Sequence, residues 1–368
     1  MNTTIKINRE TLLEPLNAVS GIIERRHTLP ILSNVLLERK GNDIIIVATD
    51  IEIQISARAV CANPGETKAI TVGARKLLDI LRALPEQSEV TLTLQEKKLQ
   101  VKAAKSRFNL QTLPAEDFPK LSLAEGESTK MTLQQKVLKQ LFLSVQYAMA
   151  QQDIRYYLNG LLLVTGGDKI TAVATDGHRL ALASAAHKTD GAQEVILPRK
   201  TILELSKLMS DSEDPVVVEL SPTQARFSFG GIVLISKLVD GKFPDYTRVI
   251  PTTHTKKLLL NRITLLQALQ RAAILTNEKF KGVRWMLADG SLKIICSNNE
   301  QEEAQEELDI TYAGEALDIG FNVNYLQDVL NNLDCSEVEC ALGDANSSAL
   351  ITVPGNNNFK YVVMPMRI

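Results

Sequence analysis

The chain contains 368 residues, 45% of them hydrophobic and 23% charged, and its formal net charge is −2. This composition excludes a disordered or collagen-like chain, and the length predicts two or three domains with buried cores. Because no stretch approaches the ~18 apolar residues of a membrane span, we expect a soluble, cytoplasmic protein that binds no membrane. The slightly acidic balance, taken alone, argues against a protein that coats nucleic acid.

The chain opens on a predicted helix. Apolar residues at Leu12, Leu16 and Val19 recur at helical spacing after Asn8, a residue suited to capping a helix. Pro15 lies inside this pattern and should kink the helix or delay its start.

Strands and a second helix follow in the same unit. A β-rich run ends in Val-Ala-Thr-Asp at 47–50, and the basic pair Arg75 and Lys76 opens a new helical pattern. Alternating runs at 89–94, 99–103 and 107–113 then predict strands joined by hairpins.

The same order of elements returns further along the chain. Val-Ala-Thr-Asp recurs at 173–176, and Arg199 with Lys200 follows the first basic pair at a distance of 124 residues. An amphipathic stretch at 132–149 precedes them, and Thr132 with Gln135 fits a capping box, so we expect a helix from Thr132. Such self-similarity indicates a duplicated structural unit.

A third, more diverged copy occupies the end of the chain. It comprises a helical stretch from Asn261, a strand run at 291–299 and a helical pattern at 322–333. Each unit therefore predicts two helices on one face of an antiparallel sheet, an α+β fold. We expect three clamp-like domains at 1–126, 127–253 and 254–368.

The predicted helices carry an excess of positive charge. Eleven Lys and Arg stand against five Asp and Glu in 8–20, 74–84, 132–149, 198–209, 261–274 and 323–333, whereas the rest of the chain holds 30 against 38. A charged face on one helix is usually only a solvated face. Six such helices predict a positive surface, which suits duplex DNA if the sheets form an outer wall and the helices line a concave side.

Catalytic and metal-binding signals are weak. Asp176 with His178 is the one pair that resembles an acid/base unit, but Gly177 between them indicates a turn. Gly166-Gly167 reads as a hairpin signal rather than a phosphate-binding loop. The four cysteines Cys61, Cys296, Cys335 and Cys340 form no CxxC pair and predict reduced thiols. We therefore expect no enzyme, no metal and no cofactor.

Five longer motifs carry a resemblance to a known family. They are Arg-Arg-His-Thr-Leu-Pro-Ile-Leu at 25–32, and the segments 152–160, 175–180, 236–246 and 361–367. In this order they resemble the bacterial beta sliding clamps, the beta subunits of DNA polymerase III. The resemblance spans the whole chain and implies a head-to-tail homodimeric ring of three-domain subunits, with the helices inside. It also implies a processivity factor that encircles duplex DNA, without reading its sequence, and catalyses nothing.

The resemblance also assigns residues to DNA and to partner proteins. The positions that match DNA contacts are Arg26, Arg75, Gln152, Tyr156, Tyr157, Arg199 and Lys200. The alternative for the two tyrosines is packing in the core. The family binds short linear motifs of the DNA polymerase III alpha subunit, the clamp loader, other polymerases and repair proteins in an apolar cleft. The matching cleft positions are Arg155, Leu158, Thr175, Gly177, His178, Arg179, Leu180, Pro244, Arg248, Val249, Asn322, Tyr325, Ser348, Val362, Met364, Pro365, Met366 and Arg367.

Ring closure requires two different surfaces that fit each other. Basic residues on strands of the first unit and an acidic run in the third have opposite charge. Ile274 and Leu275 resemble the apolar part of the family's interface, and Phe108 is expected to pack opposite them. The candidate interface residues are Lys105, Arg107, Phe108, Ile274, Leu275, Glu302, Glu303 and Glu306. The alternative for an acidic run is a solvated segment.

An open, monomeric DNA-binding or scaffold protein built from the same repeats is the competing class. Such a protein would bind circular and linear DNA alike and would lose affinity as salt rises. A closed ring would persist on circular DNA and slide off linear ends.

Overall fold

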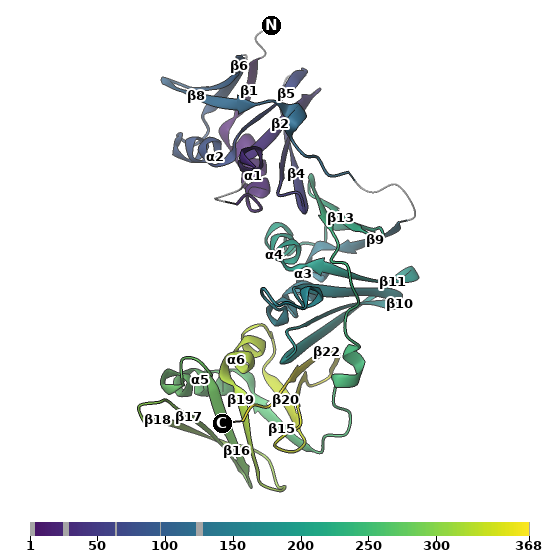
Figure 1. Cartoon of the computed structure of the whole chain (residues 1–368), viewed down its shortest axis with the longest axis vertical. Coiled ribbons are helices and arrows are strands. Elements are labelled where there is room, and N and C mark those ends of the chain that lie inside the picture. Colours follow the sequence, from purple (N-terminus) through teal and green to yellow (C-terminus); the bar gives the residue numbers. More distant parts are fainter. Residues whose placement is uncertain (1–3, 25–28, 63–64, 96, 123–127, 368) are drawn as a thin grey trace. The chain divides into compact units, whose positions relative to one another are not determined.

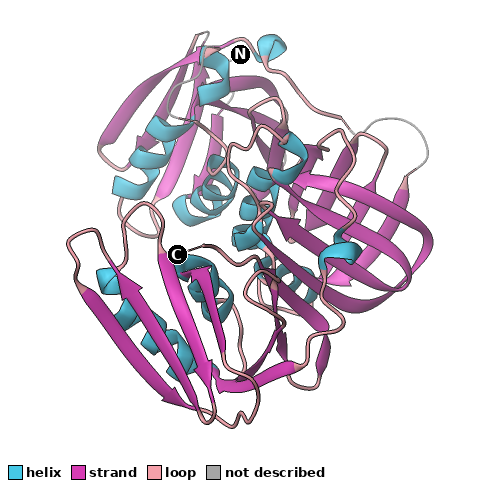
Figure 2. Ribbon diagram, turned by 60° about the horizontal axis from the view of Figure 1, so that its bottom comes forward, coloured by secondary structure: helices cyan, strands magenta, loops and turns pink. Residues whose placement is uncertain are grey.

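The computed structural model describes residues 4–24, 29–62, 65–95, 97–122 and 128–367 (Figure 1). Helices lie against broad antiparallel sheets, as Figure 2 shows in cyan and magenta. The predicted α+β class is therefore confirmed. None of the helices formed by the described residues has the length and apolar character that crossing a membrane requires.

The described residues form six α-helices, two in each of the three repeats. They are α1 (Arg9–Ser20), α2 (Ala74–Ala83), α3 (Gln135–Leu143), α4 (Arg199–Leu208), α5 (Arg262–Ala272) and α6 (Val323–Asn331). Asn8, Asn261 and Asn322 cap α1, α5 and α6, because each side-chain oxygen accepts a hydrogen bond from a backbone N–H in the first turn.

Two predictions about helix starts are wrong. Pro15 does not delay the first helix, since α1 begins at Arg9 and the buried ring of Pro15 lies with Leu12 and Leu16 on the apolar face. The alternative, that Pro15 kinks the helix, stays a prediction. The second repeat has no helix start at Thr132, which belongs to strand β9 (Thr129–Gln134). Met131 and Leu133 of that strand are buried in alternation, so two-residue periodicity outweighs the local capping pattern.

The chain divides into two compact units, Met1–Lys136 with Leu203–Leu238, and Val137–Ile202 with Val239–Ile368. The first unit contains a 12-stranded sheet in the order β1-β6-β7-β8-β5-β2-β3-β4-β14-β13-β12-β9. Its strands from the first repeat are β1 (Thr4–Asn8), β2 (Asn34–Lys40), β3 (Asp43–Thr49), β4 (Ile53–Val60), β5 (Thr67–Gly73), β6 (Glu89–Gln95), β7 (Lys98–Ala103) and β8 (Ser106–Leu113). The second repeat adds β9, β12 (Pro215–Leu220), β13 (Gln224–Phe229) and β14 (Ile232–Lys237).

The second unit contains two sheets, in the orders β10-β11-β22-β21-β20-β15 and β18-β17-β16-β19. The strands of the first are β10 (Gly160–Thr175), β11 (Arg179–Pro198), β15 (Lys256–Asn261), β20 (Glu337–Leu342), β21 (Ala349–Val353) and β22 (Asn356–Val363). Those of the second are β16 (Gly282–Ala288), β17 (Ser291–Ser297), β18 (Glu303–Asp309) and β19 (Leu317–Asn322). Gly166 and Gly167 do not form the predicted hairpin. They lie where the pairing of β10 with β11 shifts register, and both have positive φ.

The sheets run from one repeat into the next. Strand β4 of the first repeat pairs antiparallel with β14 of the second, and β11 of the second pairs antiparallel with β22 of the third. The two compact units consequently do not coincide with the three sequence repeats, because strands of neighbouring repeats pair within one sheet.

The repeated Val-Ala-Thr-Asp sequence forms the same turn twice. The Asp50 carboxylate accepts hydrogen bonds from the N–H groups of residues 52 and 53, and the Asp176 carboxylate accepts them from residues 178 and 179. In each turn the residue after Asp has positive φ, 72° for Ile51 and 88° for Gly177. Asn298 begins a related turn in the third repeat, but its side-chain oxygen accepts from the N–H groups of residues 300 and 302, and the positive φ of 64° falls on Gln301. The turn geometry is thus shared by the first two repeats and is one residue longer in the third.

Gly177→Ala is expected to lower the free energy of unfolding by about 1–2 kcal/mol, because an L-residue in the left-handed region meets its own carbonyl. The new Cβ would also approach Nη2 of Arg155 to 2.9 Å. Ile51→Gly, at the equivalent position, should change stability by less than about 1 kcal/mol, because relief of strain is offset by greater freedom of the unfolded chain. Urea denaturation measures both. Equal stability of Gly177→Ala and the natural protein would contradict this account.

Candidate DNA-binding and partner-binding sites

An apolar cluster forms where β10, β11 and β22 meet. Its buried members include Leu158, Leu180 and Val362, three of the predicted cleft residues. Phe243 closes the cluster, and the half-buried Tyr246 packs against it. The cluster therefore joins side chains from the second and third repeats, which are far apart in the sequence.

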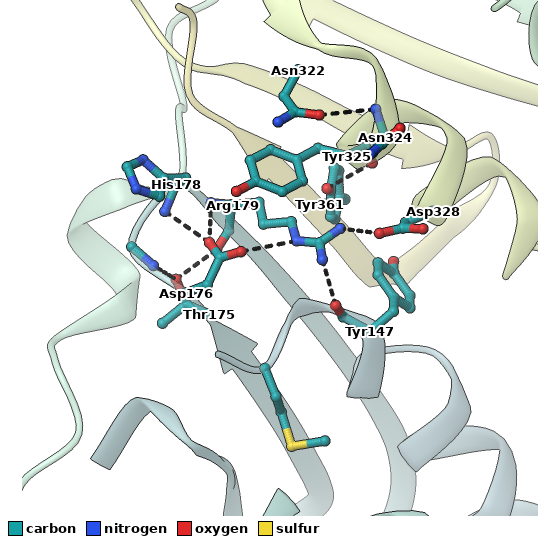
Figure 3. Close-up of polar contacts among 12 residues, drawn as sticks. Tyr147, Thr175, Asp176, His178, Arg179, Asn322, Asn324, Tyr325, Asp328 and Tyr361 are labelled. Atoms are coloured by element: carbon teal, nitrogen blue, oxygen red, sulfur yellow. Dashed lines mark hydrogen bonds and ion pairs between the residues drawn. The ribbon is translucent and has the colours of Figure 1, made fainter. Parts of the chain in front are cut away.

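Arg179 connects this cluster to helix α6 (Figure 3). Its Nε lies 3.2 Å from Oδ2 of Asp176, its Nη1 lies 2.5 Å from Oδ2 of Asp328, and its Nη2 donates to the Tyr147 carbonyl at 2.6 Å. The guanidinium also lies 4.3 Å from the centre of the Tyr325 ring. With its side chain 10% exposed, Arg179 uses its donors inside the protein and stabilises the site rather than presenting a free charge.

The electrostatics of this centre favour a charged arginine beside neutral tyrosines. Burial would lower the pKa of Arg179, but the electrostatic interactions with Tyr361, Asp328 and Asp176 outweigh it and raise that pKa. Burial raises the pKa of Tyr361 and of Tyr147 well above the ordinary tyrosine value. The Tyr361 hydroxyl donates to the Tyr325 carbonyl at 2.9 Å, so it also helps to hold α6 in place.

The C-terminal tail is attached by its backbone. The Met364 N–H donates to the His178 carbonyl at 2.8 Å, and the Met366 N–H donates to the Gly320 carbonyl at 2.8 Å. The Met364 side chain is nevertheless 50% exposed. A methionine held by its main chain, with a free thioether, is suited to accommodating different apolar ligands.

Several predicted cleft residues have other partners in the structure. Arg155 forms hydrogen bonds to Asp153, which lower the pKa of that carboxyl to about 2. Arg248 pairs with Asp245 at 2.8 Å. The Ser348 carbonyl lies 2.7 Å from Nε2 of His254. The remaining members occupy the 175–180 turn, the segment 244–249, the start of α6 and the tail, all within the second compact unit.

The predicted DNA-binding residues differ in exposure. Arg75 is exposed on α2, where it lines a cavity of about 450 Å³ together with Lys76. Gln152 is exposed, and Tyr156 is 57% exposed. Tyr157 is half-buried and packs against the apolar cluster, as the core alternative predicts.

The remaining predicted DNA-binding residues are Arg199 and Lys200 at the start of α4, and Arg26 near the N-terminus. Arg199 is half-buried and donates to the Met149 carbonyl at 3.1 Å, so part of its role is structural. Lys200, beside it, is also half-buried. Arg26 lies outside the described residues.

The predicted interface residues lie on open strand edges and nearby loops. Lys105, Arg107 and the half-buried Phe108 belong to β8 or its turn, whereas Glu302, Glu303 and Glu306 lie in or next to β18. Ile274 is 77% exposed after α5, and Leu275 beside it is half-buried. Glu306 pairs with Arg271 of the same chain, which lowers the pKa of that carboxyl.

The cysteines show no reactive environment. All four are free, and burial raises the pKa of Cys296 to about 11 and that of Cys340 to about 12. In the part of the chain that the structure describes, no group of three or more His, Cys, Asp or Glu side chains could hold a metal ion. Asp176 bonds to backbone N–H groups and Arg179, so its contacts are those of a turn residue.

Sequence reasoning missed part of the site. Asp328, Tyr147 and Tyr361 complete the surroundings of Arg179, yet none was singled out as a site residue. Asp328 was visible only as the single acid of the last predicted helix. Pairing with an arginine 149 residues away leaves no local signal.

Three family models match successive parts of the chain. They are described as the N-terminal, central and C-terminal domains of the DNA polymerase III beta subunit, and they cover residues 3–122, 132–245 and 247–367. Three repeated α+β units that continue one another's sheets define the chain as a sliding clamp.

Full-length relatives agree with these models. The chain is 48% identical over 364 residues to the beta sliding clamp of Pseudomonas putida, covering 98% of this chain and 99% of the relative. It is 45% identical over 363 residues to that of Escherichia coli strain K12, with the same coverage. A crystal structure of DNA polymerase III subunit beta from Pseudomonas aeruginosa superimposes with a TM-score of 0.96 at 46% identity, over 100% of both chains. A second structure of this clamp, with griselimycin bound, gives 0.95 at 45% identity, again over 100% of both.

The chain belongs to the family of DNA polymerase III beta subunits, the bacterial beta sliding clamps. The resemblance inferred from five sequence motifs is confirmed.

Proposed function

We propose that this clamp encircles duplex DNA as a head-to-tail homodimer and tethers the DNA polymerase III alpha subunit and other partners to it. One observation carries the proposal: the same strand pairing joins repeat one to repeat two and repeat two to repeat three, and among the described residues β18 and most of β8, which would make a third joint, lack a partner strand on one side. A second copy of the chain supplies the missing partner for each.

The domain limits proposed for this arrangement are 1–126, 127–253 and 254–368. The family matches at 3–122, 132–245 and 247–367 support three domains of this size. The two compact units divide the central domain, because it shares one sheet with each neighbour.

The open strands are β18 and β8. Strand β18 is the last in its four-stranded sheet, and β8 pairs with β5 only at Leu113 and Thr112 among the described residues. In the repeats, β18 corresponds to β4 and β11, whereas β8 corresponds to β14 and β22. An antiparallel pair between β18 of one copy and β8 of another would repeat the joint seen twice within the chain.

The internal joint also predicts the register of the pair. Phe108 corresponds to Leu234, since each lies two residues after the first paired residue that follows an equivalent hairpin turn, and Leu234 pairs with Ile55. Ile55 corresponds to Ala304, since each lies two residues after the carbonyl that closes the repeated turn. Phe108 is therefore expected opposite Ala304 of the second copy.

This register brings opposite charges together. With Phe108 opposite Ala304 in an antiparallel pair, Lys105 lies opposite Glu307. Arg107 then has Glu303 and Glu307 as its two diagonal neighbours on the other strand. The exposed Ile274 and its neighbour Leu275 follow α5, which packs against β18, so they would extend the apolar part of the interface. Lys105, Arg107, Phe108, Glu303, Ile274 and Leu275 thus fit one geometry, whereas Glu306 is paired with Arg271 of its own chain.

DNA binding is proposed to rest on many weak contacts. Arg75, Gln152, Tyr156, Arg199 and Lys200, with Tyr157 and Arg26, supply groups that bind phosphate or stack. Contacts of this kind give salt-dependent, sequence-independent attraction, which permits sliding. The topological link of the ring then supplies the persistence that the individual contacts lack.

Partner binding is proposed for the predicted cleft around Leu158, Leu180, Val362 and Met364. The buried apolar cluster and the exposed Met364 support this assignment. We propose that short linear motifs of polymerases, the clamp loader and repair proteins bind there. Tethering raises the local concentration of polymerase at its primer end, which is an effective-concentration effect and requires no catalysis by the clamp. A cytoplasmic location, proposed with it, agrees with the four free cysteines.

Retention on DNA of different topology tests the ring. The clamp, loaded by its clamp loader onto nicked circular DNA, should remain bound through gel filtration in high salt and should be released when a restriction enzyme linearises the circle. An Ile274→Asp variant, with a charge placed in the proposed interface, should sediment as a monomer and be lost from the circle.

Leu259→Asp, on β15 of the third repeat, is the matched control. Leu259 is 51% exposed and lies outside the proposed interface, so this variant should leave both sedimentation and retention unchanged. An equal loss of the natural clamp from circular and linear DNA would support the open scaffold and overturn the ring.

A further inference from the structure

A polar groove lies on the sheet that also carries the apolar cluster. It has a volume of about 300 Å³, and its walls come from the segment 251–257 and from strands β20, β21 and β22. Lys257, Glu339 and Lys360 are its charged members, and His254 lies at its side. None of these residues belongs to the predicted cleft.

Strand pairing places the groove next to the cluster. Across the sheet, Leu180 pairs with Val362, Val362 with Leu350, Leu350 with Ala341 and Ala341 with Lys257. Directly paired residues share one face of a sheet, so this row runs without interruption from the cluster to the groove. Leu350 packs against the cluster and also lines the groove.

The next row along the same face is more polar. Leu182 pairs with Lys360 on β22, and Thr352 pairs with Glu339, which pairs with Leu259 on β15. The opposite face of these strands lies against α6, where the Tyr361 hydroxyl reaches the Tyr325 carbonyl. The groove therefore opens on the face of the sheet away from α6.

The segment 250–252 borders both the apolar cluster and the polar groove. Ile250 packs against the cluster, and Pro251 with Thr252 lines the groove. A peptide lying in the cleft would consequently meet the groove directly beyond Ile250 and Leu350, without crossing another element of the second unit.

The charge of the groove favours an acidic ligand. Lys257 lies 3.1 Å from Glu339, and this pair is close to neutral. Lys360 is half-buried and has no ion-pair partner among the described residues. A carboxylate placed there would meet Lys360 on β22, while Lys257 lines the far side of the same groove on β15, beyond β21 and β20. In such a partly enclosed site charges are screened less than on an open surface.

We infer that this groove binds acidic residues that flank the apolar motif of a partner peptide. The inference rests on the proposed cleft and extends it. The cleft selects the apolar motif, and the groove adds affinity for partners whose chain continues with Asp or Glu.

The test uses the intact clamp and three fluorescent peptides. One is a ten-residue clamp-binding segment of the DNA polymerase III alpha subunit, and the other two carry four additional glutamates, one at the N-terminal end and one at the C-terminal end of that segment. At low salt, one extended form should bind about 5–10-fold more tightly, the gain expected of one or two partly screened ion pairs. Lys360→Gln and Lys257→Gln together should remove this gain and leave the Kd of the unextended peptide unchanged.

Lys256→Gln is the matched control. Lys256 is the neighbour of Lys257 on β15, and its nitrogen pairs with Glu315, so this variant removes one positive charge from the same strand outside the groove and should keep the gain. Equal affinity of extended and unextended peptides, or a gain that survives the double substitution, would contradict the proposal that the groove binds acidic residues. Failure of the unextended peptide to bind the natural clamp would contradict the proposed cleft, and with it the inference about the groove.

Discussion

Replacing Arg179 by alanine is expected to lower the free energy of unfolding by about 3–5 kcal/mol, the usual cost of removing one partner of a buried ion pair. The guanidinium joins Asp176 at the repeated turn, Asp328 on α6 and the Tyr147 carbonyl. Its removal leaves the Asp176 carboxylate, with its side chain only 17% exposed, without its cation. Urea denaturation, followed by tyrosine and tryptophan fluorescence, measures the loss.

The same variant is expected to weaken peptide binding at least ~10-fold, because α6 and the tail lose their connection to the 175–179 turn. Arg179→Lys should recover only part of both effects, since one ammonium cannot reach three acceptors in different directions. Fluorescence anisotropy with a labelled clamp-binding peptide measures affinity under conditions where the variant remains folded.

Arg155→Ala is the matched control for Arg179. Arg155 also pairs with a nearby aspartate, Asp153, but its side chain is 45% exposed, so the loss of stability should stay below about 1 kcal/mol. Similar losses in the two variants would show that Arg179 is an ordinary surface arginine, contrary to the geometry of the site.

Deletion of residues 364–368 is expected to abolish detectable peptide binding, a loss of at least ~100-fold. The described part of this tail is held by the Met364 and Met366 N–H groups, and it carries the exposed thioether of Met364. No strand ends in the deleted segment, since β22 stops at Val363. The fold and the proposed dimer should therefore persist.

Two measurements separate these effects. Anisotropy reports peptide binding, and analytical ultracentrifugation reports the dimer. Met364→Ala alone should lower affinity less than the deletion, because it leaves the backbone bond to the His178 carbonyl in place. A truncated chain that sediments as a monomer, or one that still binds peptide at natural affinity, would be incompatible with the assignment of the tail to the cleft.

The repeated unit could be recognised in the sequence because its turns and helix caps depend on residues that are close together in the chain. Val-Ala-Thr-Asp forms the same turn at 47–50 and 173–176, since Thr and Asp side chains bond to backbone groups two to four residues away. The caps Asn8, Asn261 and Asn322 are local in the same sense. Where two local signals competed, as at Thr132, alternating burial in a sheet prevailed over the capping pattern, and this outcome depended on distant strand β12.

The proposed functional residues also divide into those that sequence motifs point to and those that only long-range contacts reveal. Resemblance to the family supplied the proposed cleft positions, including Arg179, but not the structural role of that arginine. Only the tertiary structure shows that Asp328 and the Tyr147 carbonyl accept hydrogen bonds from Arg179. It also shows that Lys360, which lines the groove, pairs with Leu182. By itself the sequence determined the repeats, their turns and their helices, because these depend on bonds within a few residues. The sheets shared between repeats and the charges that meet across them were decided by strand pairing over long separations, which no short pattern encodes.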